Sequence, residues 1–320
     1  MQLTGLHHVT AITAHAVRNV EFYTQVLGLR LVKKTVNQDD VSAYHLFYGD
    51  KQGSPGTEVT FFDWPNVVQN QNGSGSIAQI SLRVPGRKAL DWWAARLSKS
   101  GVDHTGVIEV NGRARIQFAD PEGLLLELAD DQQAPGGTPW ERSPVPVEMG
   151  IRGLNAVTLM VQMLDPLAAV LTEILGFQKV GEYLAEGSGR PVTVFATGSG
   201  GPGTEVHVEA GSLLMPGRLG RGGVHHVAFR VPDNEAHRAW RQRISDAGLN
   251  VTPVIDRFYF KSIYFRVPGG ILFEIATDGP GFAADEDIEH LGEKLSLPPF
   301  LEPRREYIES QLRPLEINVK

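Results

Sequence analysis

Two identical histidine doublets and one glutamate are the side chains of this chain best suited to hold a metal ion. His7-His8 stands in the string LHHVT, His225-His226 stands in VHHVAF, and Glu274 stands in GGILFEIA. Two imidazoles and one carboxylate form the facial ligand set of non-heme Fe(II) oxygenases, which leaves coordination positions open for substrate and gas. These segments lie far apart in the chain, so the chemistry requires a fold that brings them together.

The chain repeats itself after about 147 residues. With that shift Val84-Pro85 falls on Val231-Pro232, and the string GTEV at 56–59 falls on its second copy at 203–206. The glutamate of GGILFEIA falls on another glutamate in the first half without any gap. Agreement at a nearly constant offset indicates an internal duplication. We expect an N-terminal half at 1–147, a C-terminal half at 148–280 and a C-terminal extension at 281–320.

Each half divides again, which gives four units at about 3–65, 76–131, 150–210 and 222–278. Each unit opens with an alternating apolar strand, continues with an amphipathic helix and closes with two or three short strands. Glycines that suit a left-handed helix end punctuate the four helical segments, at Gly28, Gly101, Gly176 and Gly248. One βαβββ unit cannot bury both faces of its sheet. The predicted fold is therefore α+β, with four such units paired into two cup-like curled sheets.

The duplication also indicates which units share the metal. The position that matches His8 carries Ala156 in the second half, and the position that matches His226 carries Gln79 in the first. A site within each half would lack one imidazole. Pairing of unit one with unit four completes the set His8, His226 and Glu274. We predict one metal site per chain, built across the two halves, and a second cup that has lost its ligands.

These strings resemble the vicinal oxygen chelate superfamily of glyoxalase, bleomycin-resistance and extradiol dioxygenase proteins. The resemblance spans nearly the whole chain and includes YHLFYGD, GSPGTEVTFF, RVPGGILFE and GPGFAADED. Within the superfamily, the ring-cleaving dioxygenases that act on hydroquinones are the nearest match. The resemblance implies a metal held across the two halves, Fe(II) as the cofactor, and O2 and a small aromatic molecule as reactants.

The resemblance also decides between the members of each doublet. Alternation along a strand sends neighbouring side chains to opposite faces, so both histidines of a doublet bind one ion only with distortion. His8 and His226 match the ligand positions of the family. His7 and His225 then become candidates for groups beside the metal or at the rim of the pocket.

Further candidates match positions that the hydroquinone-cleaving family uses around its metal. The resemblance implies that Arg257 holds an anionic oxygen, that Tyr264 donates to the substrate and that His225 serves in acid–base steps. Thr10 returns to the strand face of His8 and is expected to bond to a substrate hydroxyl. Each also has a plain structural interpretation, as a surface cation, a core aromatic residue, a hydrogen-bonded histidine and an ordinary strand residue.

Comparison of the halves favours two of these candidates. At the shift of 147, the counterpart of Arg257 is Val110 and that of Tyr264 is Gln117. The guanidinium and the phenol therefore occur only in the half that holds Glu274.

Glyoxalase-type sites of the superfamily add a second carboxylate to the metal. The matching stretch of unit one is Thr60-Phe61-Phe62, and none of these side chains supplies an anionic oxygen. This favours activation of O2 over the proton transfers of an isomerase. Other conspicuous side chains are interpreted as structural: tryptophans of helix faces, strand or turn glutamates, and strand histidines for which a pocket is the alternative, namely Trp92, Trp93, Trp240, Glu58, Glu205, His45 and His207.

Composition limits the remaining functions. The 320 residues, 42% of them hydrophobic, suit two ordinary domains with a real core. A net charge of −7 without a basic patch argues against a nucleic-acid partner. The chain has no apolar run of membrane-spanning length, no signal segment and no cysteine, so we expect a cytoplasmic protein without disulfides.

The leading hypothesis is an Fe(II)-dependent ring-cleaving dioxygenase of the extradiol type, with hydroquinone favoured and catechol as the alternative. Mn(II) or another divalent ion could replace iron, because imidazole and carboxylate suit several metals. Two other classes remain open: a glyoxalase-like isomerase or lyase, and a non-catalytic binding or resistance protein. The extension, with helix-like stretches around 284–295 and 303–312, either covers the cup or contacts another subunit of a homo-oligomer.

Overall fold

The computed structural model describes residues 1–315, and its first half contains two of the predicted βαβββ units. The first unit consists of β1 (Leu6–Thr13), α1 (Ala16–Glu21) with a π-helical continuation (Phe22–Val26), β2 (Arg30–Val36), β3 (Tyr44–Gly49) and β4 (Glu58–Asp63). The second consists of β5 (Ser76–Val84), α2 (Arg87–Lys99), β6 (Ile108–Val110), β7 (Arg113–Ala119) and β8 (Leu125–Asp130). A single 3₁₀ turn (Val147–Met149) leads into the second half.

The second half repeats this order. The third unit consists of β9 (Leu154–Val161), α3 (Leu164–Ala169) with a π-helical continuation (Val170–Ile174), β10 (Gln178–Leu184), β11 (Pro191–Ala196) and β12 (Glu205–Ala210). The fourth consists of β13 (Val224–Val231), α4 (Asn234–Asp246), β14 (Ile255–Asp256), β15 (Lys261–Arg266) and β16 (Leu272–Thr277). The duplication extends to the helices, since the first helix of each half ends in a π turn and the second is regular.

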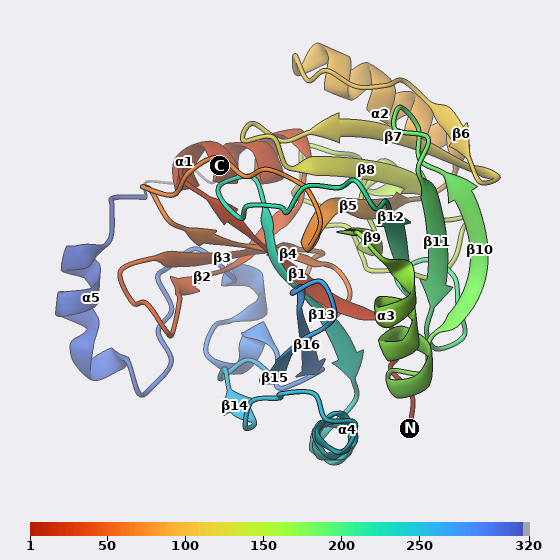
Figure 1. The fold of residues 1–320 in the computed structure, drawn as a ribbon. Helices are drawn as coiled ribbons and strands as arrows, with labels where there is room; N and C mark the ends of the chain where they lie inside the picture. The colour runs from red at the N-terminus through yellow and green to blue at the C-terminus, as the bar shows by residue number, and fades with distance from the viewer. Residues whose placement is uncertain (316–320) are drawn as a thin grey trace.

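The units pair across the halves, as the retained and lost histidines predict. β1 runs antiparallel to β13, which joins unit one to unit four, and β5 runs antiparallel to β9, which joins unit two to unit three. Each pair of units curls into one cup, and the two cups meet where Ile77 of β5 lies opposite Val224 of β13 (Figure 1). The α+β fold with two curled sheets is confirmed.

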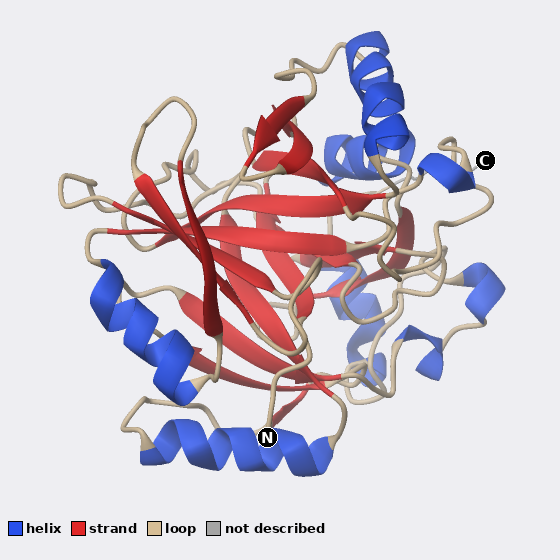
Figure 2. Ribbon diagram, turned by 90° about the vertical axis from the view of Figure 1, so that its right-hand side faces the viewer, coloured by secondary structure: helices blue, strands red, loops and turns tan. Residues whose placement is uncertain are grey.

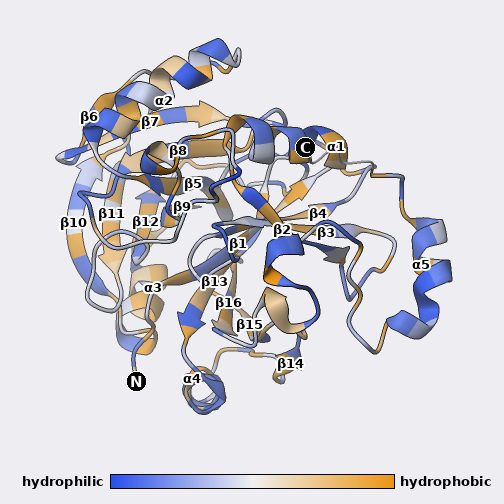
Figure 3. Cartoon of the chain, turned by 180° about the vertical axis from the view of Figure 1, so that it is seen from behind, coloured by the Kyte–Doolittle hydropathy of each residue, from blue (hydrophilic) through white to orange (hydrophobic). Residues whose placement is uncertain are grey.

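Helices cover the outer faces of the strands (Figure 2). α2 turns Leu90, Trp93 and Leu97 into the core, and α4 turns Trp240 inward, so the tryptophans serve packing as expected. Hydrophilic residues alternate with these along both helices (Figure 3), which is the pattern of a helix that lies on a sheet. No helix within residues 1–315 is both long and apolar enough to cross a membrane.

The glycines at the predicted helix ends have left-handed backbones. Their φ angles are +69° at Gly28, +70° at Gly101, +74° at Gly176 and +79° at Gly248. A side chain at these positions would strain the backbone, which explains why the same residue type recurs in all four units.

The C-terminal extension lies along β2 of the first cup. The helix expected around 284–295 is wrong, because that stretch forms only short 3₁₀ turns, at Phe282–Ala284 and Ile288–His290. Gly292 has a φ of +76°, which a right-handed helix does not allow, and the backbone of Leu31 leaves no room for a side chain there. A further turn (Glu302–Arg304) leads into α5 (Arg305–Gln311), which confirms the second expected helix.

Lys33 fastens this extension to the cup. Its side chain is fully buried and its ammonium donates to the carbonyl of Phe282, to Asp285 at 2.7 Å and to Glu286. The same ammonium lies 4.7 Å from the ring centroid of Tyr259. A lysine without exposure is tolerated only where such partners replace water.

We predict that Lys33→Met loosens the extension. The substitution keeps the length of the side chain but leaves two carboxylates without their cation, which costs about 3 kcal/mol of folding free energy. Urea unfolding and limited proteolysis of the extension measure the effect. The control Lys34→Met removes only a hydrogen bond to the carbonyl of Glu293. Equal midpoints for the two variants would contradict an anchoring role for Lys33.

Candidate metal centre

The structure brings His8, His226 and Glu274 together from three adjacent strands. Ala228 of β13 lies opposite His8 of β1 on one side and opposite Glu274 of β16 on the other. His226 stands two residues before Ala228 and therefore faces the same side of the sheet. Glu274 Oε2 lies 2.9 Å from His226 Nε2 and 3.3 Å from His8 Nε2. All three side chains are buried.

The contacts of His7 decide which nitrogen of His8 carries the proton. His7 Nε2 lies 3.1 Å from the carbonyl oxygen of Thr277, which only accepts hydrogen bonds, so this nitrogen is the donor. Burial, then the neighbouring His8, lower the pKa of His7 to about 3, and the ring is neutral. Its Nδ1 is therefore an acceptor for His8 Nδ1, which lies 3.0 Å away. His8 Nδ1 is therefore the donor in this contact, and its Nε2 faces Glu274, where the lone pair of a metal-binding ring would lie.

The second doublet repeats this contact. His225 Nδ1 lies 2.8 Å from His226 Nδ1, and burial lowers the pKa of His225 to about 3. Strict alternation would keep the two rings of a doublet apart, as the sequence analysis assumed. Irregular pairing of β1 with β13, between Leu6 and His8, lets the His7 ring turn toward its neighbour. The ring centroids of His7 and His8 are only 5.1 Å apart.

Glu274 directs one carboxylate oxygen toward the two imidazoles. Its Oε1 accepts a hydrogen bond from Ser262, whereas its buried Oε2 lies beside His226 Nε2 and His8 Nε2. Burial favours the neutral acid, but the adjacent His8 and His226 outweigh it and hold the pKa of Glu274 well below its usual range. A carboxylate oxygen and two imidazole nitrogens that converge in a buried site suit a divalent cation. The residues therefore fit a metal ion.

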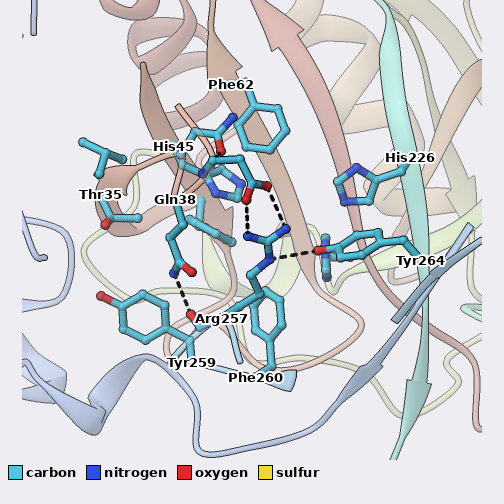
Figure 4. Close-up of a pocket in the computed structure, with 14 residues that line it drawn as sticks. Thr35, Gln38, His45, Phe62, His226, Arg257, Tyr259, Phe260 and Tyr264 are labelled. Atoms are coloured by element: carbon cyan, nitrogen blue, oxygen red, sulfur yellow. Dashed lines mark hydrogen bonds and ion pairs between the residues drawn. The ribbon is translucent and has the colours of Figure 1, made fainter. Parts of the chain in front are cut away.

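A narrow pocket opens beside these side chains, and four of the predicted residues line it: His8, His226, Arg257 and Tyr264 (Figure 4). The other walls are largely aromatic, from Phe47, Phe62, Tyr259 and Phe260. Its volume of about 40 Å³ holds roughly three water molecules. An aromatic ring therefore requires the pocket to widen.

An ion pair closes the mouth of this pocket. Arg257 donates to both carboxylate oxygens of Asp39, at 3.1 and 2.8 Å, and Gln38 donates to the carbonyl of Arg257 (Figure 4). Arg257 Nε also donates to the hydroxyl oxygen of Tyr264 at 3.3 Å. Burial, with the charge of Glu274, raises the pKa of Tyr264, so its hydroxyl keeps a proton to donate into the pocket.

The four other predicted residues, Glu274 among them, do not line the pocket. His7 lies behind His8, and His225 lies against Phe62 and Trp64. Thr10 is fully buried and accepts a hydrogen bond from Thr60. These side chains contact residues of the site but do not contact the space that a ligand can occupy.

His45 is the pocket residue that the sequence analysis undervalued. Its Nε2 lies 2.9 Å from the hydroxyl of Thr60, which itself donates to Thr10. Thr60 therefore accepts from His45, which leaves Nδ1 of this pocket-lining ring without a proton. Burial lowers the pKa of His45 well below its usual value and keeps the ring neutral. Its counterpart at the shift of 147 is Val192, the same kind of difference that singles out Arg257.

Two further residues bear on the expected absence of a second acidic ligand. Phe62, from the stretch that supplies no acid, lines the pocket with an apolar ring. Glu58, interpreted as a plain strand or turn residue, is buried beside His7, with its Oε2 3.9 Å from His7 Nδ1. Burial, then Asp50, raise the pKa of Glu58 well above its usual range. It forms a group with His7 and His8 that does not include Glu274.

Comparison with known proteins points to one superfamily. The sequence model of the Glyoxalase/Bleomycin resistance protein/Dioxygenase superfamily matches residues 5–128 and 153–275. MhqA of Bacillus subtilis (strain 168), named as a candidate ring-cleaving dioxygenase, is 46% identical over 99% of this chain and 100% of its own length. The chlorohydroquinone/hydroquinone 1,2-dioxygenase of Sphingobium indicum is 33% identical over 94% of this chain and 93% of its own.

Solved structures agree with this. The crystal structure of a candidate dioxygenase from Bacillus subtilis superposes with a TM-score of 0.91 at 41% identity and covers 99% of both chains. Glyoxalase I from Zea mays superposes with a TM-score of 0.62 at 16% identity and covers 86% of this chain and 92% of its own. The second likeness shows a common fold.

We predict that His7→Phe weakens binding of a divalent ion 10- to 100-fold, because His8 Nδ1 loses the acceptor that orients its ring. The matched variant His7→Gln supplies an oxygen acceptor and is expected to retain most of the affinity. Competition with a chromogenic chelator measures the affinity, and thermal unfolding of the metal-free variants reports on folding separately. Unchanged affinity in a folded His7→Phe protein would contradict the orienting role.

Proposed function

The chain belongs to the Glyoxalase/Bleomycin resistance protein/Dioxygenase superfamily, and from this premise we propose that it is an Fe(II)-dependent dioxygenase that opens a hydroquinone ring with O2. The convergence of His8, His226 and Glu274 in a buried site carries the proposal. The names of MhqA, a candidate ring-cleaving dioxygenase, and of the Sphingobium indicum chlorohydroquinone/hydroquinone 1,2-dioxygenase, which align over nearly their whole lengths, support it. Cleavage beside a hydroxyl-bearing carbon, the extradiol type, is part of the proposal.

His8, His226 and Glu274 would hold the metal through two neutral nitrogens and one anionic oxygen. Bound there, Fe(II) would bring a phenolic oxygen and O2 together at its open positions and lower the pKa of the phenol. Both oxygen atoms enter the product, so the reaction needs no external reductant. Mn(II) suits the same ligands and is the alternative ion.

Tyr264 and Arg257 position the ring oxygen. The Tyr264 hydroxyl accepts from Arg257 and keeps its own proton for a ligand in the pocket. The guanidinium is free to bind an anionic oxygen once it releases Asp39, and its planar donors suit that task. Together these side chains stabilise the negative charge that a phenol acquires when it loses its proton.

His45 serves the far end of the substrate. Because His45 Nε2 donates its proton to the hydroxyl oxygen of Thr60, Nδ1 of the ring is free to accept a hydrogen bond from a hydroxyl group. A para-diol carries its second hydroxyl across the ring from the first, so it needs an acceptor of its own, whereas an ortho-diol presents both oxygens on one side. An acceptor in the pocket wall therefore favours hydroquinone over catechol. The ring itself would lie among Phe62 and Phe260, whose apolar surfaces exclude water.

The proposal is tested with the full-length chain, reconstituted anaerobically with Fe(II) and mixed with O2. We expect O2 uptake with hydroquinone, slower uptake with catechol, and a ring-opened product that contains both labelled atoms of ¹⁸O2. His226→Ala is expected to lower kcat about a hundredfold or more, since loss of a ligand exceeds the effect of losing a supporting residue. His290→Ala, a surface histidine, is the control.

Absence of O2 uptake with both diols in the iron-loaded protein would reject the proposal. Conversion of a thiol adduct without O2 would replace it with a glyoxalase-like isomerase. The stretch Thr60-Phe61-Phe62 argues against that second function, because it supplies no further acid and Phe62 lines the pocket with an apolar ring.

We predict that Asp39→Asn lowers KM for hydroquinone about two- to fivefold and changes kcat less than twofold. The variant releases Arg257 from an ion pair whose carboxylate is 72% exposed, and such a pair is worth at most about 1 kcal/mol. Steady-state O2 uptake measures both constants. Asp40→Asn is the control, since that carboxylate bonds only to Ser42 within residues 1–315. A raised KM in Asp39→Asn would show that Asp39 assists binding instead of blocking Arg257.

A further inference from the structure

The second cup, built from units two and three, retains a pocket at the position of the first. This cavity has a volume of about 510 Å³, within the range of small-molecule sites. Residues that line it are the counterparts of residues that line the first pocket: Gln79 for His226, Val110 for Arg257, Gln117 for Tyr264, Tyr183 for Thr35, Val192 for His45 and Glu209 for Phe62. Equivalent positions therefore line a pocket in both cups, but the residue types at these positions differ.

An arginine occupies the place of the metal in this cup. Glu127, the counterpart of Glu274, accepts hydrogen bonds from Ser81 and Gln117 and pairs with Arg115 at 3.1 Å. Arg115 is 4% exposed and replaces Ser262 of the first cup. Its guanidinium supplies a fixed positive charge beside the carboxylate, which removes any need for a bound cation. A ligand of this pocket would therefore bind without a metal ion.

Several polar groups that line this pocket have unused hydrogen-bonding capacity. Within residues 1–315, the side chains of Gln79 and Thr158 engage in no hydrogen bond, and both are only partly buried. A ligand that forms hydrogen bonds with them would replace water at these groups. These groups include both donors and acceptors, and they suit a hydroxyl group, which is both.

The remaining walls suit a flat apolar body. The guanidinium carbon of Arg115 lies 5.8 Å from the centroid of the Tyr183 ring, and Phe118 and Val192 add apolar surface. Leu125 stays 44% exposed beside the opening. An aromatic ring would cover these surfaces, since guanidinium and aromatic faces both stack on π systems.

Charge disfavours anionic ligands. At the floor, the charge of Arg115 is compensated by Glu127. At the mouth, Asp103 and Glu186 are exposed carboxylates that repel an anion, and Glu209 is paired with Arg190. The groups that a ligand would meet therefore favour an uncharged molecule over a carboxylate.

We propose that the second cup is a metal-independent binding site for an uncharged, hydroxyl-bearing aromatic molecule of the phenol class. The site is distinct from the metal centre and needs no ion at Glu127. It makes this chain a protein with two pockets of common origin, one for chemistry and one for binding alone.

The test uses the full-length, metal-free chain and 4-fluorophenol, observed by ¹⁹F NMR. We expect saturable binding, with 4-fluorobenzoate at least about tenfold weaker because of the carboxylates at the mouth. The double variant Gln79→Leu/Thr158→Val is expected to weaken binding of 4-fluorophenol about tenfold through loss of its hydrogen bonds. His226→Leu, the same position in the first cup as Gln79 in the second, is the matched control and keeps the affinity.

A second variant keeps the proposal testable if the double variant fails to fold. Val110→Trp fills the cavity from the partly exposed strand β6 and is expected to abolish binding of 4-fluorophenol. Loss of binding in His226→Leu with retention in Val110→Trp would place the phenol in the first cup and overturn the proposal. No saturable binding to the wild-type chain, or equal binding of 4-fluorobenzoate, would also overturn it.

Discussion

Antiparallel pairing of β1 with β13 is the contact on which the rest of the molecule depends. It sets His8, Ala228 and Glu274 side by side across three strands, and it places His226 on the same face. Ala228 is fully buried between the two ligand candidates, where its small side chain leaves room for them to converge. Pairing within each half would instead leave each cup with a single imidazole. The metal centre is thus a property of the sheet register.

Once these side chains are buried, their charges must be balanced without water. In the first cup a chain of hydrogen bonds, from the carbonyl of Thr277 through His7 to His8, orients the His8 ring so that its Nε2 faces Glu274. In the second cup Arg115 provides the positive charge itself. The two cups solve one problem, a buried carboxylate, in two ways. Only the first arrangement presents two imidazole nitrogens and a carboxylate oxygen to one point, as a metal ion requires.

The C-terminal extension packs on the first cup, and the strand that holds it also lines the pocket. Lys33 of β2 holds residues at 282–286, and the same strand carries Thr35, which lines the pocket. The mouth of the pocket is closed by the pair of Arg257 with Asp39, contributed by different halves. Substrate access therefore depends on contacts between segments that are distant in the chain, as the metal centre itself does.

The sequence alone determined the fourfold βαβββ order, the helix ends and the cross-half convergence of His8, His226 and Glu274, because duplication compares equivalent positions directly. Arg257 and Tyr264 emerged from the same comparison and line the pocket. Only the tertiary structure decided the roles of His45, Asp39 and Arg115, and the turn of His7 toward His8. These depend on which side chains meet across long-range strand pairs, on a local irregularity of β1 and on loop positions, none of which periodicity or spacing encodes. The helix expected near 284–295 failed for the same reason, since backbone contact with Leu31 overrides local preference there.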